Sequence, residues 1–204
     1  MKPYTLILLS ALAPTAWGNL TPTGTTITGT GPYTWSYNLQ LSNDQDVTSG
    51  FAPAVNPVPH ANLTFAGFFT IYDFAGYIGG SCSGPAGWTC TAQNVGFTPD
   101  DVTPIDNPGI VNLTWAYTTG ATLLGQPIGL NLGTFSAQST FNLVSTVSYT
   151  GRGIKNIGSQ AGTIADNVGN TQGPIAVPEP VTLAFTGLGL MLLGLVRTRR
   201  KPTV

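Results

Sequence analysis

Apolar and polar residues alternate with a period of two in three separate stretches of this chain. The stretches are 35–41, 111–117 and 141–149, the last of them with Ser145 as an interruption. Alternate side chains of a strand point to the same face, so each stretch predicts a half-buried β-strand. Stretch 63–78 is more continuously apolar and predicts a central strand, or two strands broken near Asp73 and Gly76.

Turn-forming residues divide the chain into short segments. The 204 residues include 26 Gly and 16 Pro, and expected turns that contain these residues interrupt the sequence every ten residues or so. No amphipathic helix of useful length is present in the body of the chain, which favours an all-β fold. Several short antiparallel strands around one core predict a β-sandwich, with a jelly roll or a barrel as the alternative.

The amino-terminal end is typical of a secretory signal peptide. Lys2 precedes an apolar stretch, 4–13, and small residues stand at Ala16 and Gly18. We expect cleavage between Gly18 and Asn19, so that residues 1–18 are removed. The apolar stretch is too short to be a first membrane-spanning helix.

The carboxyl-terminal end combines three features in a fixed order. Val177, Pro178, Glu179 and Pro180 are followed by an uncharged stretch, 181–196, and then by four cations: Arg197, Arg199, Arg200 and Lys201. As a helix the uncharged stretch covers about 24 Å, slightly less than the hydrocarbon core of a bilayer. We therefore expect one C-terminal transmembrane helix whose basic end stays in the cytoplasm.

This end closely resembles the PEP-CTERM sorting signal of Gram-negative bacteria, although Val181-Thr182 replaces the Ser-Thr of many family members. The resemblance implies that an exosortase recognises the Pro-Glu-Pro motif in segment 177–204 and that the tail is then removed. The protein would be anchored in the inner membrane at first and would then reach the periplasm, the outer surface or the extracellular matrix. The same domain has been labelled an ice-binding protein C-terminal domain, which describes the tail and not an activity. The alternative is an ordinary C-terminal membrane anchor, because the same hydropathy and charge would produce one.

Between the two ends we expect a β-sandwich body, 19–160, and a Gly-rich linker, 161–176, although the Gly-rich residues 151–176 could also hold one last strand before the linker. Residues 19–176 contain seven aspartates but only two cations, Arg152 and Lys155, and therefore carry a net charge of −5. An acidic body with two cations is a poor ligand for nucleic acid or for an acidic membrane surface.

The two cysteines, Cys82 and Cys90, are near neighbours in a Gly-rich segment. In an exported chain this spacing predicts a disulfide. A reactive thiol would need a nearby base, and a metal pair would need two further ligands, while the chain has a single histidine, His60.

Residues that would carry enzyme chemistry are sparse. The sequence contains no His-Glu-x-x-His, Gly-x-Ser-x-Gly or P-loop motif, and its only glutamate, Glu179, belongs to the sorting signal. We expect no enzymatic activity and no cofactor. Asp44 and Asp46 are weak candidates for a calcium site, because two carboxylates stand at i and i+2 in an expected loop.

These features predict an exported bacterial surface or matrix protein with a structural or adhesive role. Its expected partners are the secretion translocon, an exosortase-type processing enzyme, the inner membrane and exopolysaccharide. The alternative is a carbohydrate-binding module: strand alternation places Trp35 and Trp115 in the core, which leaves Trp88 to stack on a sugar ring. A secreted hydrolase is a less favoured third interpretation.

Overall fold

The computed structural model describes residues 20–50, 66–99 and 101–176. The described chain forms ten strands and one 3-10 turn, Gly158–Gln160. The strands are β1 (Leu20–Thr28), β2 (Tyr33–Leu41), β3 (Gln45–Val47), β4 (Phe68–Ile71), β5 (Trp88–Gln93), β6 (Asn112–Tyr117), β7 (Leu123–Leu124), β8 (Leu130–Ser139), β9 (Leu143–Lys155) and β10 (Ile164–Ile175). The predicted all-β class is confirmed.

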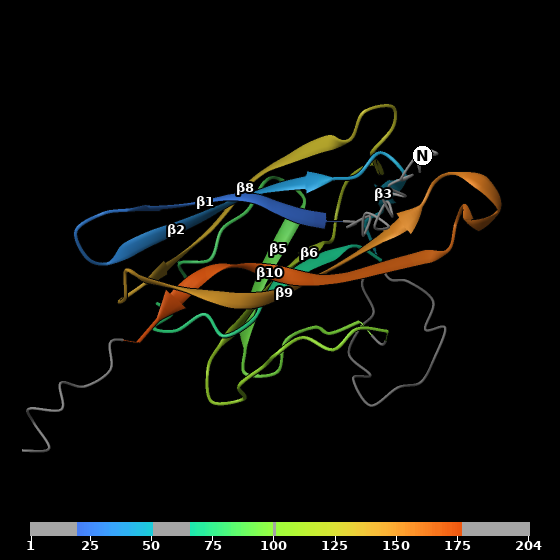
Figure 1. Cartoon of the computed structure of the whole chain (residues 1–204). Helices are drawn as coiled ribbons and strands as arrows, with labels where there is room; N and C mark the ends of the chain where they lie inside the picture. Colours follow the sequence, from blue (N-terminus) through green and yellow to red (C-terminus); the bar gives the residue numbers. More distant parts are fainter. Residues whose placement is uncertain (1–19, 51–65, 100, 177–204) are drawn as a thin grey trace, which may run out of the picture.

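The strands form two antiparallel sheets. The first has the order β1-β2-β8, and the second has the order β5-β6-β4-β9-β3-β7, with β10 paired to β9. In Figure 1 the three-stranded sheet lies above β9 and β10. Both sheets contribute buried aromatic residues to the hydrophobic core, such as Trp35 of β2 and Trp115 of β6. The arrangement of the two sheets resembles a β-sandwich, in agreement with the all-β class that the sequence predicts.

Strand β2 follows its predicted alternation. Trp35, Tyr37, Leu39 and Leu41 are fully buried, while Asn38 between them is exposed. Trp115 of β6 is also fully buried, which confirms the predicted core position of both tryptophans. Each indole N–H has a partner, because Trp35 donates to the carbonyl of Phe141 at 3.0 Å and Trp115 donates to that of Ser83 at 2.9 Å.

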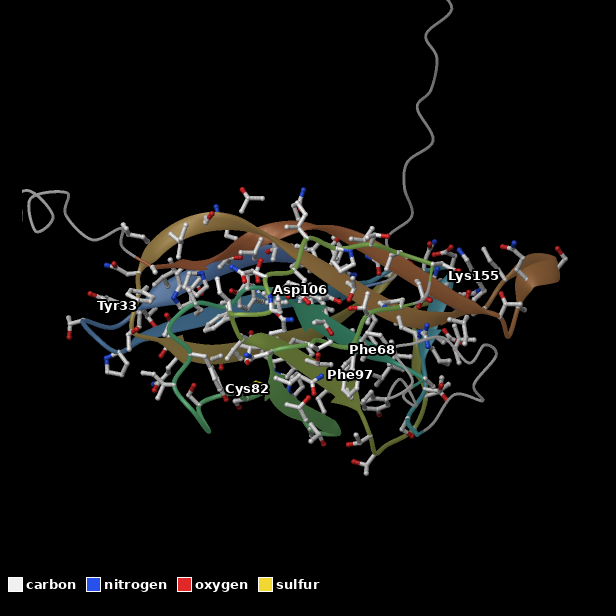
Figure 2. All side chains as sticks on the ribbon, turned by 90° about the horizontal axis from the view of Figure 1, so that it is seen from below. Tyr33, Phe68, Cys82, Phe97, Asp106 and Lys155 are labelled. Atoms are coloured by element: carbon white, nitrogen blue, oxygen red, sulfur yellow. A yellow bond between two sulfur atoms is a disulfide. The ribbon has the colours of Figure 1, made fainter. Side chains whose placement is uncertain are left out.

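Strand β6 departs from the half-buried pattern, because both of its faces are buried. The loop after β5 covers its second face. The hydroxyl of Thr70 lies 2.8 Å from that of Thr114 and donates to the carbonyl of Phe97 at 3.0 Å. Phe97 also packs against Phe68 with ring centroids 6.1 Å apart, and the two side chains lie next to each other in Figure 2. Buried threonines with hydroxyl partners therefore stand where the alternation predicts solvent.

The predicted linker 161–176 is wrong for most of its length, because Ile164–Ile175 is strand β10 and pairs with β9 throughout. Its glycines make room for large neighbours. A Cβ atom at Gly169 would lie 2.7 Å from the ring of Tyr149, and one at Gly173 would lie 2.7 Å from Val147. A glycine-rich composition here serves close cross-strand packing and not chain flexibility.

Several predicted features lie outside the described residues. These are the signal peptide with Gly18 and Asn19, the histidine His60, the sorting motif Val177, Pro178, Glu179 and Pro180, the transmembrane helix, and the basic end with Arg197, Arg199, Arg200 and Lys201. In the part of the chain that is described, no helix combines the length and apolar character needed to cross a membrane.

Candidate functional site

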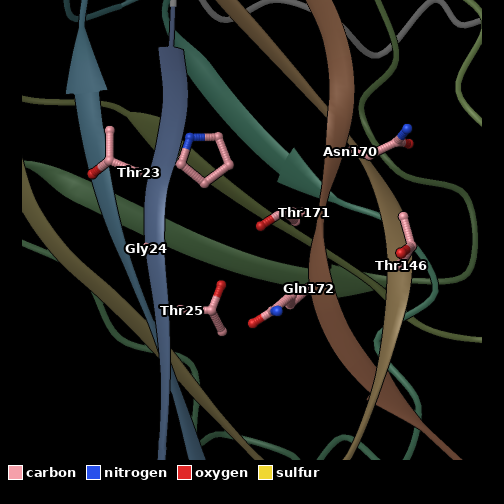
Figure 3. Close-up of a pocket in the computed structure, with 8 residues that line it drawn as sticks. Thr23, Gly24, Thr25, Thr146, Asn170, Thr171 and Gln172 are labelled. Atoms are coloured by element: carbon pink, nitrogen blue, oxygen red, sulfur yellow. The ribbon is translucent and has the colours of Figure 1, made fainter.

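An open groove with a volume of about 460 Å³ lies between β1 and β10. Figure 3 shows it with β1 on one side and β10 on the other, and with the side chains of Thr25, Thr171 and Gln172 pointing into the space between them. The lining residues come from β1, β9 and β10: Pro22, Thr23, Gly24, Thr25, Thr146, Asn170, Thr171 and Gln172. The groove therefore lies between the two sheets, at one side of the molecule.

A polar contact closes one end of the groove. The side-chain amide of Asn167 in β10 donates to the carbonyl of Leu20 at the start of β1, over 3.2 Å. From this contact both strands continue toward the groove, β1 through Thr25 and β10 through Gln172. The two strands consequently run in the same direction along its two sides (Figure 1).

The groove is polar but carries no charge. Its functional groups are threonine hydroxyls and the side-chain amides of Asn170 and Gln172, which both donate and accept hydrogen bonds. None of the lining side chains titrates near neutral pH, so the groove lacks a general acid or base. Its chemistry suits the binding of a neutral polar ligand.

Gly24 leaves additional space in the wall formed by β1. The pairing of β1 with β2 shifts register between Pro22 and Gly24. A Cβ atom at Gly24 would meet no other atom within 4 Å. A larger side chain at this position, which lines the groove, is therefore accommodated without a clash.

Trp88 is less available for ligand stacking than the sequence suggests. It lies at the start of β5 and is half-buried. Its ring contacts Phe135 edge-on at a centroid distance of 5.0 Å and Tyr117 at 5.3 Å. Trp88 thus packs against the aromatic core with part of its ring exposed, and its role in stacking on a sugar ring stays a prediction.

The predicted disulfide between Cys82 and Cys90 is present, with the two Cα atoms 6.0 Å apart. Cys90 belongs to β5 of the larger sheet, while the neighbour of Cys82, Ser83, exchanges backbone hydrogen bonds of 2.8 Å with Ser136 of β8. The bond therefore links the larger sheet to a segment that pairs with the smaller sheet, and Cys82 is marked in Figure 2.

Replacement of both cysteines by serine is expected to lower the free energy of unfolding by about 2.5 kcal/mol, because the cross-link closes a nine-residue loop. Urea unfolding of the oxidised protein and of the Cys82→Ser/Cys90→Ser variant measures the difference. The reduced wild-type protein is the matched control and should unfold like the double variant. Equal stability of the oxidised and reduced forms would contradict the expectation.

Asp44 and Asp46, the weak calcium candidates, are engaged by protein groups. Asp44 accepts a hydrogen bond from Ser42 at 2.7 Å and forms an ion pair of 2.9 Å with Lys155. Burial acts to raise the pKa of Asp44, but the bonds from Ser42 and Lys155 outweigh it and hold the pKa below its usual value. Asp46 accepts from the amide of Asn156 at 2.7 Å. Both carboxylates join the β3 corner to the end of β9.

A second group of polar residues, which the sequence pattern does not reveal, lies at the start of β6. The buried Asn112 accepts from the backbone N–H of Asp73 at 2.8 Å and donates to Asp106 at 3.0 Å. The backbone N–H of Asn107 donates to Asp73 at 2.8 Å. Burial raises the pKa of Asp73, and the nearby charge of Asp106 acts in the same direction. These bonds attach the loop before β6 to the end of β4.

Metal ligands do not converge in the described parts of the chain. Among residues 20–50, 66–99 and 101–176, no group of three or more His, Cys, Asp or Glu side chains is placed to hold an ion.

The fold and the groove together define an all-β protein with two antiparallel sheets, one disulfide and an uncharged open groove at the side. Comparison with protein-family models, with curated proteins and with solved structures found no match to this chain.

Proposed function

We propose that this protein is an exported bacterial cell-surface or extracellular-matrix protein with a non-enzymatic, structural or adhesive role. The observation that carries the proposal is the order of features in residues 177–204: a Pro-Glu-Pro motif, an uncharged stretch and four cations. This order is the one found in PEP-CTERM sorting signals. An exosortase-type enzyme is therefore the proposed processing partner.

The body has properties that suit such a destination. Two antiparallel sheets enclose an aromatic core, and within the all-β class we propose that the fold is a β-sandwich. The disulfide between Cys82 and Cys90 suits an oxidising compartment outside the cytoplasm. Uncharged hydroxyl and amide groups line the groove, as in a surface meant for contact with neutral polymers or proteins.

The sorting motif can be tested by substitution in the native host. Glu179→Gln combined with Pro178→Ala and Pro180→Ala removes the charge and restores ordinary backbone freedom. We expect this variant to keep its tail and to accumulate in the inner membrane. Intact mass and membrane fractionation measure both properties.

Thr182→Ser is the matched control, since it changes a neighbouring residue and leaves the motif intact. It should be processed and located like the wild-type protein. If the triple variant were also processed and located like the wild type, the proposed role of the motif would be wrong.

A further inference from the structure

Two unpaired strand edges border the groove between β1 and β10. Along its length β1 pairs with β2, and β10 pairs with β9; no other strand of the described chain pairs with either. Each free edge presents a row of backbone N–H and C=O groups, interrupted at Pro22 of β1 and Pro174 of β10, which have no N–H; such a row is a template for a further strand. Figure 3 shows these two edges facing each other across the groove.

The long outer edge of the smaller sheet on its other side is covered. Strand β8 carries bridges from Tyr77 to Ser139 and from Ser83 to Ser136. The backbone N–H of Ile78 also donates to Gln138 at 2.9 Å. Segment 77–83 thus pairs with β8, while β1 and β10, nine and twelve residues long, have no such cover in the described chain.

The two free edges also lack the charges that commonly prevent strand addition. Strand β1 contains no charged residue, and the charge of β10, Asp166, lies in an ion pair with Arg152 and away from the groove. Lysines on an edge strand are a usual means of blocking further pairing. Neither edge carries one.

Because β1 and β10 run in the same direction, a single added strand can form backbone hydrogen bonds with the free edges of both. A segment antiparallel to β1 is antiparallel to β10 as well, so it can bond to both edges at once. Such a segment needs two free edges of its own, which a tail or a linker has and a strand inside a sheet does not. No aromatic side chain lines the groove, so a sugar ring would find no stacking platform there.

We propose that the groove binds an extended, uncharged polypeptide segment of a partner protein, which adds as a strand between β1 and β10. Backbone hydrogen bonds supply the binding, and the threonine, asparagine and glutamine side chains select against charged residues. Strand addition would make one continuous sheet from β2 to β9. This activity goes beyond the proposed sorting and surface role and does not depend on it.

Gly24→Phe provides a direct test. Gly24 lines the groove, a Cβ there would meet no atom within 4 Å, and the position has no unusual backbone conformation, so the variant should fold and place a bulky ring at the groove wall. Gly79→Phe is the matched control, because a Cβ there also meets no atom within 4 Å and Gly79 lies outside the groove. The exported full protein is used to select binders from a displayed library of random decapeptides. The selected peptides are then synthesised, and their affinities are measured by fluorescence polarisation.

We expect the selected peptides to be uncharged and to bind the wild type and Gly79→Phe equally. Gly24→Phe should weaken their binding at least about tenfold. Bound peptide should slow amide hydrogen exchange in residues 21–25 and 170–172. A second groove variant, Gln172→Lys, keeps the proposal testable if Gly24→Phe does not fold. It places a charge on the β10 edge and should also weaken binding, whereas Gln160→Lys, an exposed control outside the groove, should not.

The proposal is overturned if no peptide is enriched above the level obtained with Gly24→Phe or with Gln172→Lys. Equal affinity for the wild type and both groove variants would also overturn it. A third contrary result is binding of a neutral polysaccharide such as dextran that Gly24→Phe abolishes, with no peptide bound. That result would make the groove a glycan site.

Discussion

Replacement of Phe69 by alanine is expected to lower the free energy of unfolding by about 3–5 kcal/mol. Phe69 belongs to β4 in the interior of the larger sheet and is fully buried. Its ring centroid lies 5.9 Å from that of Trp115, 6.3 Å from that of Phe135 and 5.9 Å from that of Tyr149. Phe135 belongs to the smaller sheet, so the substitution opens a cavity between the two sheets.

Urea unfolding followed by tryptophan fluorescence measures this loss. Ile105→Ala is the control, because its side chain is 78% exposed and its removal should change the stability by less than about 0.5 kcal/mol. A loss below about 1 kcal/mol for Phe69→Ala would mean that the two sheets do not share the core described above.

A loss of similar size, about 3–5 kcal/mol, is expected for Arg152→Met. The guanidinium of Arg152 donates to both carboxylate oxygens of Asp166, at 2.8 and 2.9 Å, and its Cζ lies 5.5 Å from the ring centroid of Phe68. Both side chains are nearly buried, with exposed fractions of 7% and 6%. Methionine keeps most of the volume but removes the charge that compensates the buried carboxylate.

Two variants separate the charge effect from packing. Arg152→Met combined with Asp166→Asn removes both charges and should recover part of the loss, because the buried carboxylate is gone. Lys155→Met breaks the more exposed pair with Asp44, in which the lysine is 24% exposed, and should cost about 0–1 kcal/mol. If Arg152→Met and Lys155→Met had the same small effect in thermal unfolding, the Arg152–Asp166 pair would not be buried in solution.

Features that depend on neighbouring residues could be predicted from the sequence. The alternation in 35–41 places Trp35 in the core because strand geometry is local. The disulfide between Cys82 and Cys90 could be predicted from their short spacing together with the expected export of the chain. The apolar character of 63–78 correctly indicates a central strand, Phe68–Ile71.

Features that depend on distant pairing could not. The linker prediction failed because the glycines of β10 are explained by Tyr149 and Val147 across the sheet, and their spacing along the chain does not reveal that pairing. The second face of β6 is buried by the loop containing Phe97, which covers Thr114. The sequence of β6 contains no local pattern that predicts this contact with the loop.

The groove was missed for the same reason. Its two walls are about 145 residues apart in sequence, and each looks like an unstructured polar segment when taken alone. The threonines of β1 and the glycines, asparagines and glutamine of β10 form a surface only after both sheets assemble. The sequence instead indicates Trp88 as the candidate for ligand stacking, but the ring of Trp88 packs against Phe135.

The most direct test of the proposed sorting and surface role is the intact mass of the natively expressed protein, measured together with its location by fractionation. We expect a mass that lacks residues 1–18 and the segment after the Pro-Glu-Pro motif, found outside the inner membrane. A mass that retains residues 181–204, found in the inner membrane, would contradict the proposal and would identify the tail as a permanent C-terminal anchor.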